Sequence, residues 1–154
     1  MVAENRSGMA LNLESQRGRA EALLARLGYD TGELGLAFTA PDEMERLNRE
    51  YLGRTGPTDV LTFPLDAGEG DGGGGKAPAG GAAEYSPPLL LGDIVICPQV
   101  AERQADGAGH SLDAELCLLL VHGMLHLAGY DHETDTGTMD ARQAELVKEF
   151  CRQN

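Results

Sequence analysis

Hydrophobic and polar positions follow two periodicities along the chain, one of three to four residues that predicts helices and one of two residues that predicts strands. From Gln16 to Leu27 the apolar side chains recur every three or four residues, with Ser15 as N-cap, which predicts an amphipathic helix. Alternation from Leu34 to Phe38 is typical of a half-buried strand. The same periodicities predict helices at 41–51, 99–106, 112–127 and 136–151, and strands at 58–64 and 89–97. The strand at 89–97 is the most hydrophobic, and we expect it in the centre of a sheet.

Two stretches show neither periodicity. Residues 1–14 contain no predicted element, and we expect them to be loosely ordered. Segment 67–88 is rich in glycine, since eight of the chain's 21 glycines fall between Ala67 and Gly81. With almost nothing apolar to bury, it is expected to be a flexible insertion between two strands. The length predicts one domain over 1–154.

Composition narrows the class of protein. Lys and Arg number 12 against 25 Asp and Glu, which gives a formal net charge of −13 at pH 7. This balance argues against a general nucleic-acid binder, because bulk phosphate binding depends on Lys and Arg. No stretch approaches the roughly 18 apolar residues of a membrane span, and the N-terminal residues show no signal peptide. The three cysteines, Cys97, Cys117 and Cys151, are widely spaced, so we expect buried thiols and a cytoplasmic protein.

Three of the four histidines lie close together, at His122, His126 and His132. On a helix, His122 and His126 stand one turn apart on one face, and Gly129 lets the chain turn His132 back toward them. Three imidazoles with a vacant fourth position form the ligand set of a catalytic zinc site. Residues 106–140 contain seven acidic side chains and no Lys or Arg, which favours a cation. We predict one zinc ion per chain, which would activate water at neutral pH.

The spacing of these histidines is shared with the metzincin proteases, so a zinc peptidase is the rival enzymatic hypothesis. Those enzymes need a glutamate directly after the first histidine as general base. Gly123 occupies that position here, and glycine transfers no proton. A peptidase with this sequence would be a degenerate one, whereas metal-assisted hydrolysis of another substrate remains open.

The histidine block resembles the signature of the YbeY family, bacterial single-domain zinc endoribonucleases of ribosomal RNA maturation. The block reads HGMLHLAGYDH over 122–132. Further matches follow the family pattern in order: LN at 47–48, PTDVLTFP at 57–64 and LGDIVI at 91–96. The similarity covers roughly residues 16–150, and the histidine block combined with PTDVLTFP is highly specific.

This resemblance implies a zincin-like α+β fold, with a small mixed sheet flanked by helices and a metal-binding helix near the C-terminal end. It implies Zn²⁺ bound by His122, His126 and His132. The implied substrate is single-stranded ribosomal RNA, in 16S rRNA 3′-end maturation and ribosome quality control. The implied partners are the small ribosomal subunit and a ribosomal or assembly-factor protein, with neither DNA nor a membrane. A non-catalytic, zinc-stabilised ribosome assembly factor is the alternative outside the enzymes.

One departure from the family pattern affects the expected catalytic machinery. The family has an arginine directly after the aromatic position of Tyr51, thought to hold phosphate near the metal, and this chain has Leu52 there. Arg54 follows two positions later, and a guanidinium can pair bidentately with phosphate. Arg54 is therefore either the catalytic substitute for the missing arginine or an ordinary loop charge. The leucine at this position also favours the non-catalytic alternative.

The charge is distributed unevenly. Residues 1–56 hold seven Lys and Arg against nine Asp and Glu, whereas residues 57–154 hold five against sixteen. The basic side chains gather in the first two helices and the loop after them, where they could form a modest RNA-facing surface. We expect weak, salt-sensitive RNA affinity that relies on a protein or ribosomal partner.

A further group of residues has both a functional and a structural interpretation. Glu115 could orient a histidine ring of the site or serve the helix dipole. Asp131 could act as an acid or base, orient a ligand or cap the turn. We expect structural hydrogen bonds for Asp59 and Asp93, and solvent exposure for His110.

Overall fold

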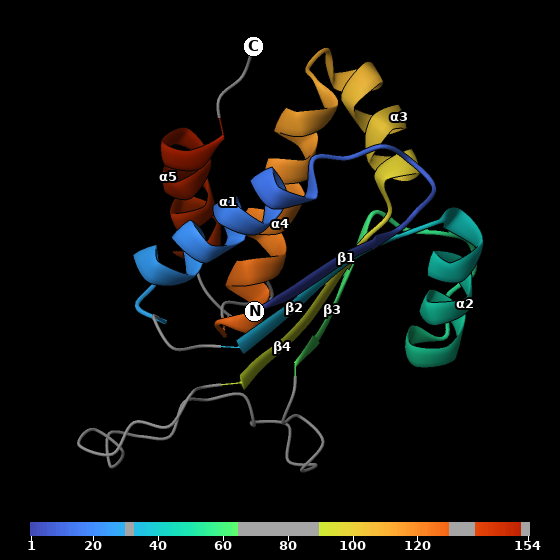
Figure 1. Cartoon of the computed structure of the whole chain (residues 1–154), viewed down its shortest axis with the longest axis horizontal. Coiled ribbons are helices and arrows are strands. Elements are labelled where there is room, and N and C mark those ends of the chain that lie inside the picture. Colours follow the sequence, from blue (N-terminus) through green and yellow to red (C-terminus); the bar gives the residue numbers. More distant parts are fainter. Residues whose placement is uncertain (30–32, 65–89, 130–137, 152–154) are drawn as a thin grey trace.

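The computed structural model describes residues 1–29, 33–64, 90–129 and 138–151 (Figure 1). The strands are β1 (Val2–Arg6), β2 (Glu33–Thr39), β3 (Val60–Pro64) and β4 (Leu90–Ile96). The helices are α1 (Leu13–Arg26), α2 (Pro41–Leu52), α3 (Pro98–Ala108), α4 (Leu112–Leu127) and α5 (Thr138–Phe150). This arrangement confirms the expected α+β class. The glycine-rich segment 67–88 lies outside the described residues.

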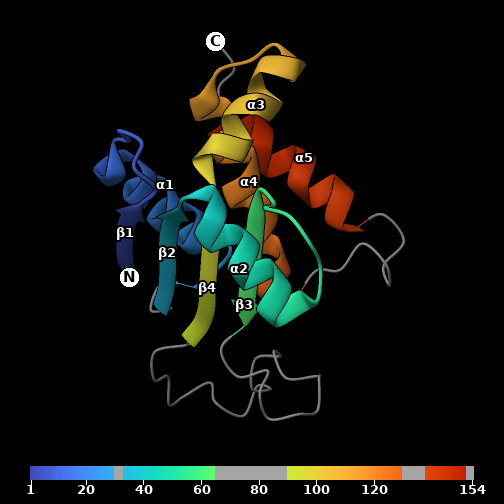
Figure 2. The same cartoon turned by 90° about the vertical axis from the view of Figure 1, so that its right-hand side faces the viewer.

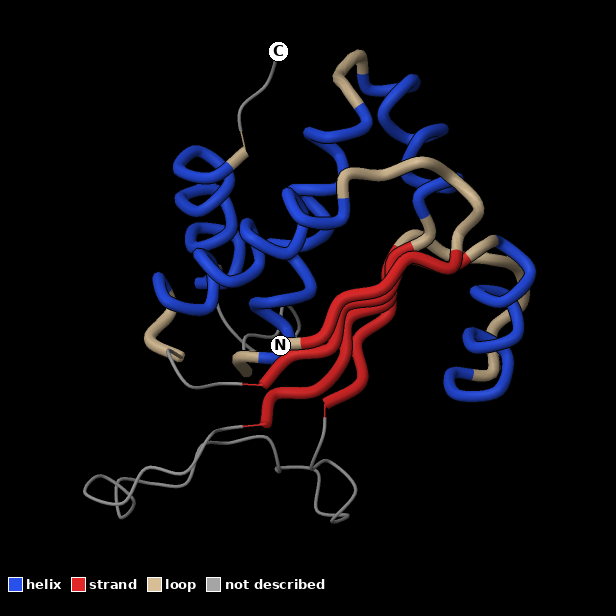
Figure 3. Tube along the Cα trace, in the orientation of Figure 1, coloured by secondary structure: helices blue, strands red, loops and turns tan. Residues whose placement is uncertain are grey.

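The strands form one mixed sheet in the order β1-β2-β4-β3 (Figure 3). β1, β2 and β4 run parallel, with Leu36 opposite Ile94, whereas β3 runs antiparallel to β4, with Thr62 opposite Ile94. β4 is therefore an inner strand, as expected, and β3 is an edge strand among the described residues.

The N-terminal segment differs from the expectation of loose order. Val2–Arg6 form β1, which pairs in register with Gly35–Thr39 of β2. In β1 only Ala3 packs against the apolar core, while Val2 is 70% exposed, so the strand carries almost no hydrophobic pattern. The backbone pairing with β2 supplies the order that side-chain periodicity did not predict.

The two faces of the sheet contact different helices. Ile94 and Ile96 of β4 face the cluster formed with α1, α4 and α5, whereas Val95 and Cys97 face a smaller cluster that includes Met44 of α2. Figure 2 shows α2 on one side of the sheet and α4 on the other. Alternate side chains of one strand thus bury against opposite layers, as the period of two requires.

Helix α4 is the central element of the larger layer. It packs against β3, β4, α1, α3 and α5, and 11 of its 16 residues are buried. Ser111 caps its first turn, because the Ser111 hydroxyl accepts a hydrogen bond of 3.1 Å from the backbone N–H of Ala114. Although α4 is apolar on all sides, none of the helices in the described part of the chain is long and apolar enough to cross a membrane.

The expectation of three free thiols is wrong for two of the cysteines. Cys117 of α4 and Cys151, just after α5, form a disulfide with a Cα–Cα distance of 5.6 Å. They are 34 residues apart in sequence, and only the packing of α5 against α4 brings them together. Cys97 is a buried free thiol, as expected.

Ion pairs connect α1 to the helices beside it. Arg19 donates to Asp113 of α4 at 2.8 Å, and Arg26 pairs with Glu145 and Glu149 of α5 at 3.3 and 3.0 Å. Burial tends to raise the pKa of Asp113, but the hydrogen bond and charge of Arg19 outweigh it, so this pKa lies below its ordinary value of 3.8.

Candidate metal centre

The C-terminal half of α4 presents two polar side chains, His122 and His126, from an otherwise apolar sequence. Their neighbours Val121, Met124 and Leu125 are fully buried in the core, whereas both histidines are half-buried. The helix therefore holds the two imidazoles at the border of the core, one turn apart, as the sequence predicted.

The two rings converge through the same ring atom. The Nε2 atoms of His122 and His126 lie 3.1 Å apart, and the ring centroids lie 4.6 Å apart with the planes inclined at 76°. Two nitrogens bound to one tetrahedral zinc ion at 2.0–2.1 Å lie about 3.3 Å apart. The observed pair therefore fits two ligands of a single metal ion, with Nε2 as the donor atom of each.

Gln143 of α5 fixes the other side of the His122 ring. Its Oε1 lies 2.9 Å from Nδ1 of His122. An amide oxygen only accepts, so this contact requires the proton on Nδ1, and Nε2 is then the unprotonated nitrogen, which is the form that binds a metal. Sequence reasoning missed this residue. The signal was a polar side chain on the stripe of α5 that also contains the buried Met139 and Leu146.

The chain leaves α4 through Gly129, as expected. Gly129 has φ of 101°, and its N–H donates to the carbonyl of His126 at 3.1 Å. The last carbonyls of a helix carry partial negative charge, which favours a cation beside His126. His132 and Asp131 lie outside the described residues, and within those that are described no group of three metal-binding side chains occurs. The structure thus places two of the three predicted ligands.

Gly123 lies between the two histidines in sequence and faces the sheet. A Cβ at this position would lie 3.2 Å from Cγ2 of Ile94 and 3.3 Å from Cγ2 of Thr62. The helix therefore approaches β3 and β4 closely, and a side chain at this position would displace Ile94 and Thr62 by a few tenths of an ångström. A glutamate of the kind that metzincin proteases use as general base would also point toward these apolar groups of the sheet.

The loop after α2 carries Arg54. Gly53 ends α2 with φ of 69°, and the buried Asn48 holds the loop by donating from Nδ2 to the carbonyl of Gly56 at 2.9 Å. Arg54 is exposed and forms no ion pair or side-chain hydrogen bond within the described ranges. The geometry is compatible with phosphate binding by this guanidinium, which remains a prediction.

Comparison with known proteins identifies the family. A model of the Endoribonuclease YbeY family matches residues 7–151. The chain belongs to the Endoribonuclease YbeY family. The Endoribonuclease YbeY of Salinispora tropica is 44% identical over 93% of this chain and 90% of its own length. That of Renibacterium salmoninarum is 45% identical over 91% of this chain and 90% of its own length.

The fold of this YbeY family member has a relative among solved structures. The solution structure of TM1509 from Thermotoga maritima superimposes with a TM-score of 0.63 at 26% sequence identity. The match covers 97% of this chain and 89% of that protein. The similarity therefore extends over the whole sheet and its helices.

Two acidic candidates belong to a polar cluster at the other end of α4. One interpretation of Glu115 is that it orients a histidine ring of the metal centre. It contacts the ring of His110 instead, with His110 Nε2 2.5 Å from Glu115 Oε1. The expected exposure of His110 is therefore wrong, since its side chain is only 16% exposed. Asp59 accepts from the backbone N–H of Val60 at 2.7 Å, which confirms its structural role. Glu115 lies two helical turns before His122 on α4, so these residues are separate from the candidate metal centre.

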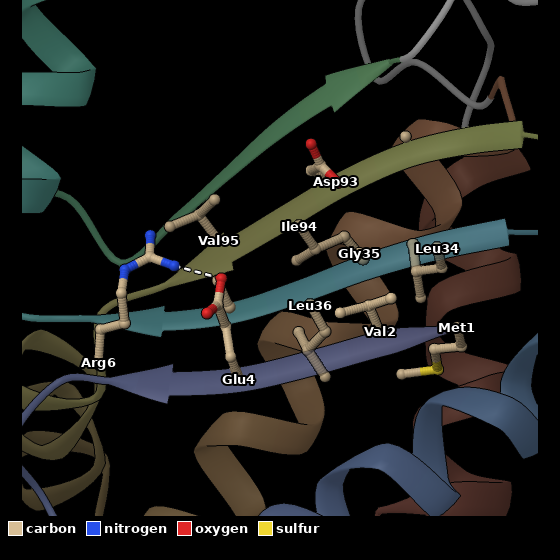
Figure 4. A pocket seen from close by; sticks show the side chains of 12 residues that line it. Met1, Val2, Glu4, Arg6, Leu34, Gly35, Leu36, Asp93, Ile94 and Val95 are labelled. Atoms are coloured by element: carbon tan, nitrogen blue, oxygen red, sulfur yellow. Dashed lines mark hydrogen bonds and ion pairs between the residues drawn. The ribbon is translucent and has the colours of Figure 1, made fainter.

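Asp93 lies elsewhere again, in an open depression of about 460 Å³ along β1, β2 and β4 (Figure 4). Its carboxylate stands over Gly35, where a Cβ would come within 2.2 Å of Asp93 Oδ1. The expected structural hydrogen bond is wrong, because the exposed carboxylate makes none with the described residues. The depression is unsuited to phosphate, since its one arginine, Arg6, is already paired with Glu4 and Glu43.

Proposed function

We propose that the chain is a zinc-dependent endoribonuclease that cleaves single-stranded ribosomal RNA. Its membership of the Endoribonuclease YbeY family supports the reaction class, a hydrolysis of RNA. The observation that carries the metal is the convergence of His122 and His126 through Nε2, with Gln143 holding the tautomer that binding needs. His132 completes the ligand set in this proposal.

The chemistry divides between the ion and the chain. When bound, zinc supplies Lewis acidity for water activation or for polarisation of a phosphoryl oxygen. His122 and His126 hold the ion at the end of α4, and Gln143 keeps the proton of His122 on Nδ1. Arg54 offsets the negative charge of the phosphate in the transition state.

The proposal extends to the cellular setting. The whole chain, 1–154, acts as a single metallohydrolase domain in the cytoplasm, in 16S rRNA 3′-end maturation and ribosome quality control. Its partners are the small ribosomal subunit and a ribosomal or assembly-factor protein, and DNA is not a substrate. The packing at Gly123 supports RNA over a peptide as the substrate of the metal centre.

The first test combines metal content with substrate choice. Purified protein is expected to contain close to one zinc per chain, to cleave a ribosomal RNA fragment and to leave denatured protein intact. His126→Ala should lose both zinc and cleavage, because Nε2 of His126 is a ligand. His110→Ala is the matched control and should keep both, since its ring contacts Glu115. Cleavage of the protein substrate alone, or zinc retained by His126→Ala, would contradict the proposal.

Arg54 is tested separately. Arg54→Ala should retain zinc and lose most of the RNA cleavage, whereas Arg103→Ala, which removes an exposed arginine from α3, should retain both. If cleavage by Arg54→Ala equals that of wild type, Arg54 is an ordinary loop charge.

A further inference from the structure

Tyr51 lies at the end of the sheet-facing stripe of α2 and remains exposed. Met44 and Asn48 occupy the same stripe and are buried, whereas Tyr51 is 64% exposed. Large apolar side chains usually gain about 1.5–3 kcal/mol from burial, so an exposed aromatic at the end of a buried stripe requires an explanation.

The ring of Tyr51 contacts the protein through one neighbouring aromatic ring. It packs edge-to-face on Phe63 of β3, with ring centroids 5.3 Å apart and planes inclined at 72°. Phe63 is half-buried in the cluster beneath α2 and supports the Tyr51 ring. Leu52, the next residue, is 48% exposed, and these two are among the three large exposed apolar side chains in the described part of the chain. The result is a fixed aromatic surface that remains accessible to a ligand.

The two arginines nearest to Tyr51 in the sequence are available to a ligand. Most described arginines are neutralised by carboxylates: Arg6, Arg17, Arg19, Arg26, Arg46 and Arg142 all form ion pairs. Arg49 and Arg54, two residues before and three residues after Tyr51, are exposed and form no ion pair within the described ranges. An exposed aromatic ring with two unpaired guanidinium groups within three residues of it in the sequence matches the chemistry of single-stranded nucleic acid, with bases that stack and phosphates that pair.

The edge strand β3 connects this surface to the metal centre. Phe63 supports Tyr51 on one face of β3, and its neighbour Thr62 lies on the other face, against Gly123 of α4. Figure 2 shows the end of α2 in front of β3 and α4 behind it. A strand of RNA that passes the edge of β3 can therefore reach both sides.

We propose that the Tyr51 ring is a stacking platform for one base of the RNA substrate, and that Arg49 and Arg54 bind the phosphates beside it. This inference rests on the proposed function and names a binding subsite for it. Because Arg54 offsets the charge of the cleaved phosphate in the proposed function, the base stacked on Tyr51 belongs to a neighbouring nucleotide and not to the one that is cleaved. Tyr51 therefore acts as a positioning residue, and its loss should raise KM while kcat is retained.

A direct test uses the absence of tryptophan from the chain. Tyr51→Trp places a unique fluorophore on the platform, and the added His122→Ala substitution keeps the RNA intact. Titration with a short single-stranded RNA should quench the fluorescence, because the base stacks on the indole. The same strand made with abasic ribose keeps the phosphates and should quench far less. Equal quenching by both strands would overturn the proposal.

A kinetic test uses variants of otherwise wild-type enzyme. Tyr51→Ala should raise KM about 5- to 150-fold, the range measured when stacked aromatics are truncated, with zinc content and kcat retained. Tyr51→Phe keeps the ring and should restore the wild-type KM. Leu52→Ala, the matched control at the adjacent exposed residue, should leave KM unchanged.

The outcomes separate this inference from the proposed function. If wild type neither binds nor cleaves RNA, the proposed function fails and the platform fails with it. If wild type cleaves RNA and Tyr51→Ala has the wild-type KM, only the platform is wrong. If Tyr51→Ala keeps the wild-type KM for RNA but loses binding to a protein partner, Tyr51 belongs to a protein-docking surface and the platform is again wrong.

Discussion

Gln143 is the residue that supports the proposed role of His122 as a metal ligand. Each imidazole can carry its proton on either nitrogen, and in the absence of a partner both tautomers are populated. The contact of 2.9 Å between Gln143 Oε1 and His122 Nδ1 favours the tautomer in which Nε2 is unprotonated. The His122 ring is therefore held in the metal-binding tautomer before zinc binds. This requires one polar side chain, Gln143, beside the apolar core.

Replacement of this amide should weaken metal binding. Gln143→Leu is expected to lower zinc affinity about 10- to 100-fold, as loss of an outer partner typically does, because the His122 ring is no longer oriented. The measurement is competition with a chromophoric chelator on the folded protein.

The matched variant is Gln143→Glu, which keeps an acceptor at Nδ1 and should retain or increase the affinity. Equal affinities for wild type and Gln143→Leu would show that the contact does not orient His122.

Gly123 is the second decisive residue. The contacts of 3.2 and 3.3 Å that a Cβ would make with Ile94 and Thr62 are tight, so a larger side chain must displace these neighbours. We expect Gly123→Glu to lower the free energy of unfolding by about 3 kcal/mol or more, through overpacking and burial of an unpaired charge. Urea unfolding at pH 7 measures the change.

The control is Gly18→Glu on α1, where a Cβ meets nothing within 4 Å. Because glutamate is the better helix former, this variant should gain up to about 1 kcal/mol. A fully stable Gly123→Glu protein with peptidase activity would reverse our choice of substrate.

At the scale of elements, the site depends on how α5 packs on α4. The histidines belong to α4 and Gln143 belongs to α5, so the angle between the two helices sets the His122–Gln143 contact. Buried Met139 and Leu146 hold this packing, and the Cys117–Cys151 disulfide fixes the end of α5. The disulfide is thus part of the support of the metal centre.

The disulfide should contribute substantially to stability. A cross-link that closes 34 residues is expected to raise the free energy of unfolding by about 3–4 kcal/mol, chiefly by restricting the unfolded chain. Urea unfolding of oxidised and reduced protein measures the difference.

Cys97→Ala provides the control, because Cys97 is a free thiol and its removal should leave that difference unchanged. A thiol titration under denaturing conditions should find one free thiol in oxidised protein, and three would contradict the disulfide.

At the scale of the whole molecule, charge determines where RNA can bind. A net charge of −13 repels nucleic acid from most of the surface, and internal ion pairs occupy most of the described arginines. Arg49 and Arg54 remain available at the end of α2. An acidic protein can therefore bind RNA locally while it rejects nucleic acid elsewhere.

Salt dependence tests this distribution. For single strands, the logarithm of the affinity falls with the logarithm of salt by about 0.7 per phosphate contact. The double variant Arg49→Gln/Arg54→Gln should therefore reduce the slope by about 1.4, measured by fluorescence anisotropy with labelled RNA. Arg103→Gln on α3 should leave the slope unchanged, and an equal effect of both variants would indicate binding by diffuse charge.

The sequence by itself predicted most of the elements and the spacing of two candidate ligands on one helix face. Helix α4 spans Leu112–Leu127, as its apolar run predicted, and the chain leaves it at Gly129 as expected, because periodicity and the conformational freedom of glycine are local properties. The pair His122 and His126 followed from the same helical period. His132 remains a prediction, since it lies outside the described residues.

Only the tertiary structure decided the features that depend on distant partners. β1 owes its order to the backbone of β2, Cys117 meets Cys151 through the packing of two helices, and Glu115 turned out to orient His110. The contact between Gln143 and His122 joins residues 21 apart, and Tyr51 reaches Phe63 across the edge of the sheet. Periodicity and spacing describe neighbours along the chain, whereas these contacts arise from how the layers pack, which no local pattern encodes.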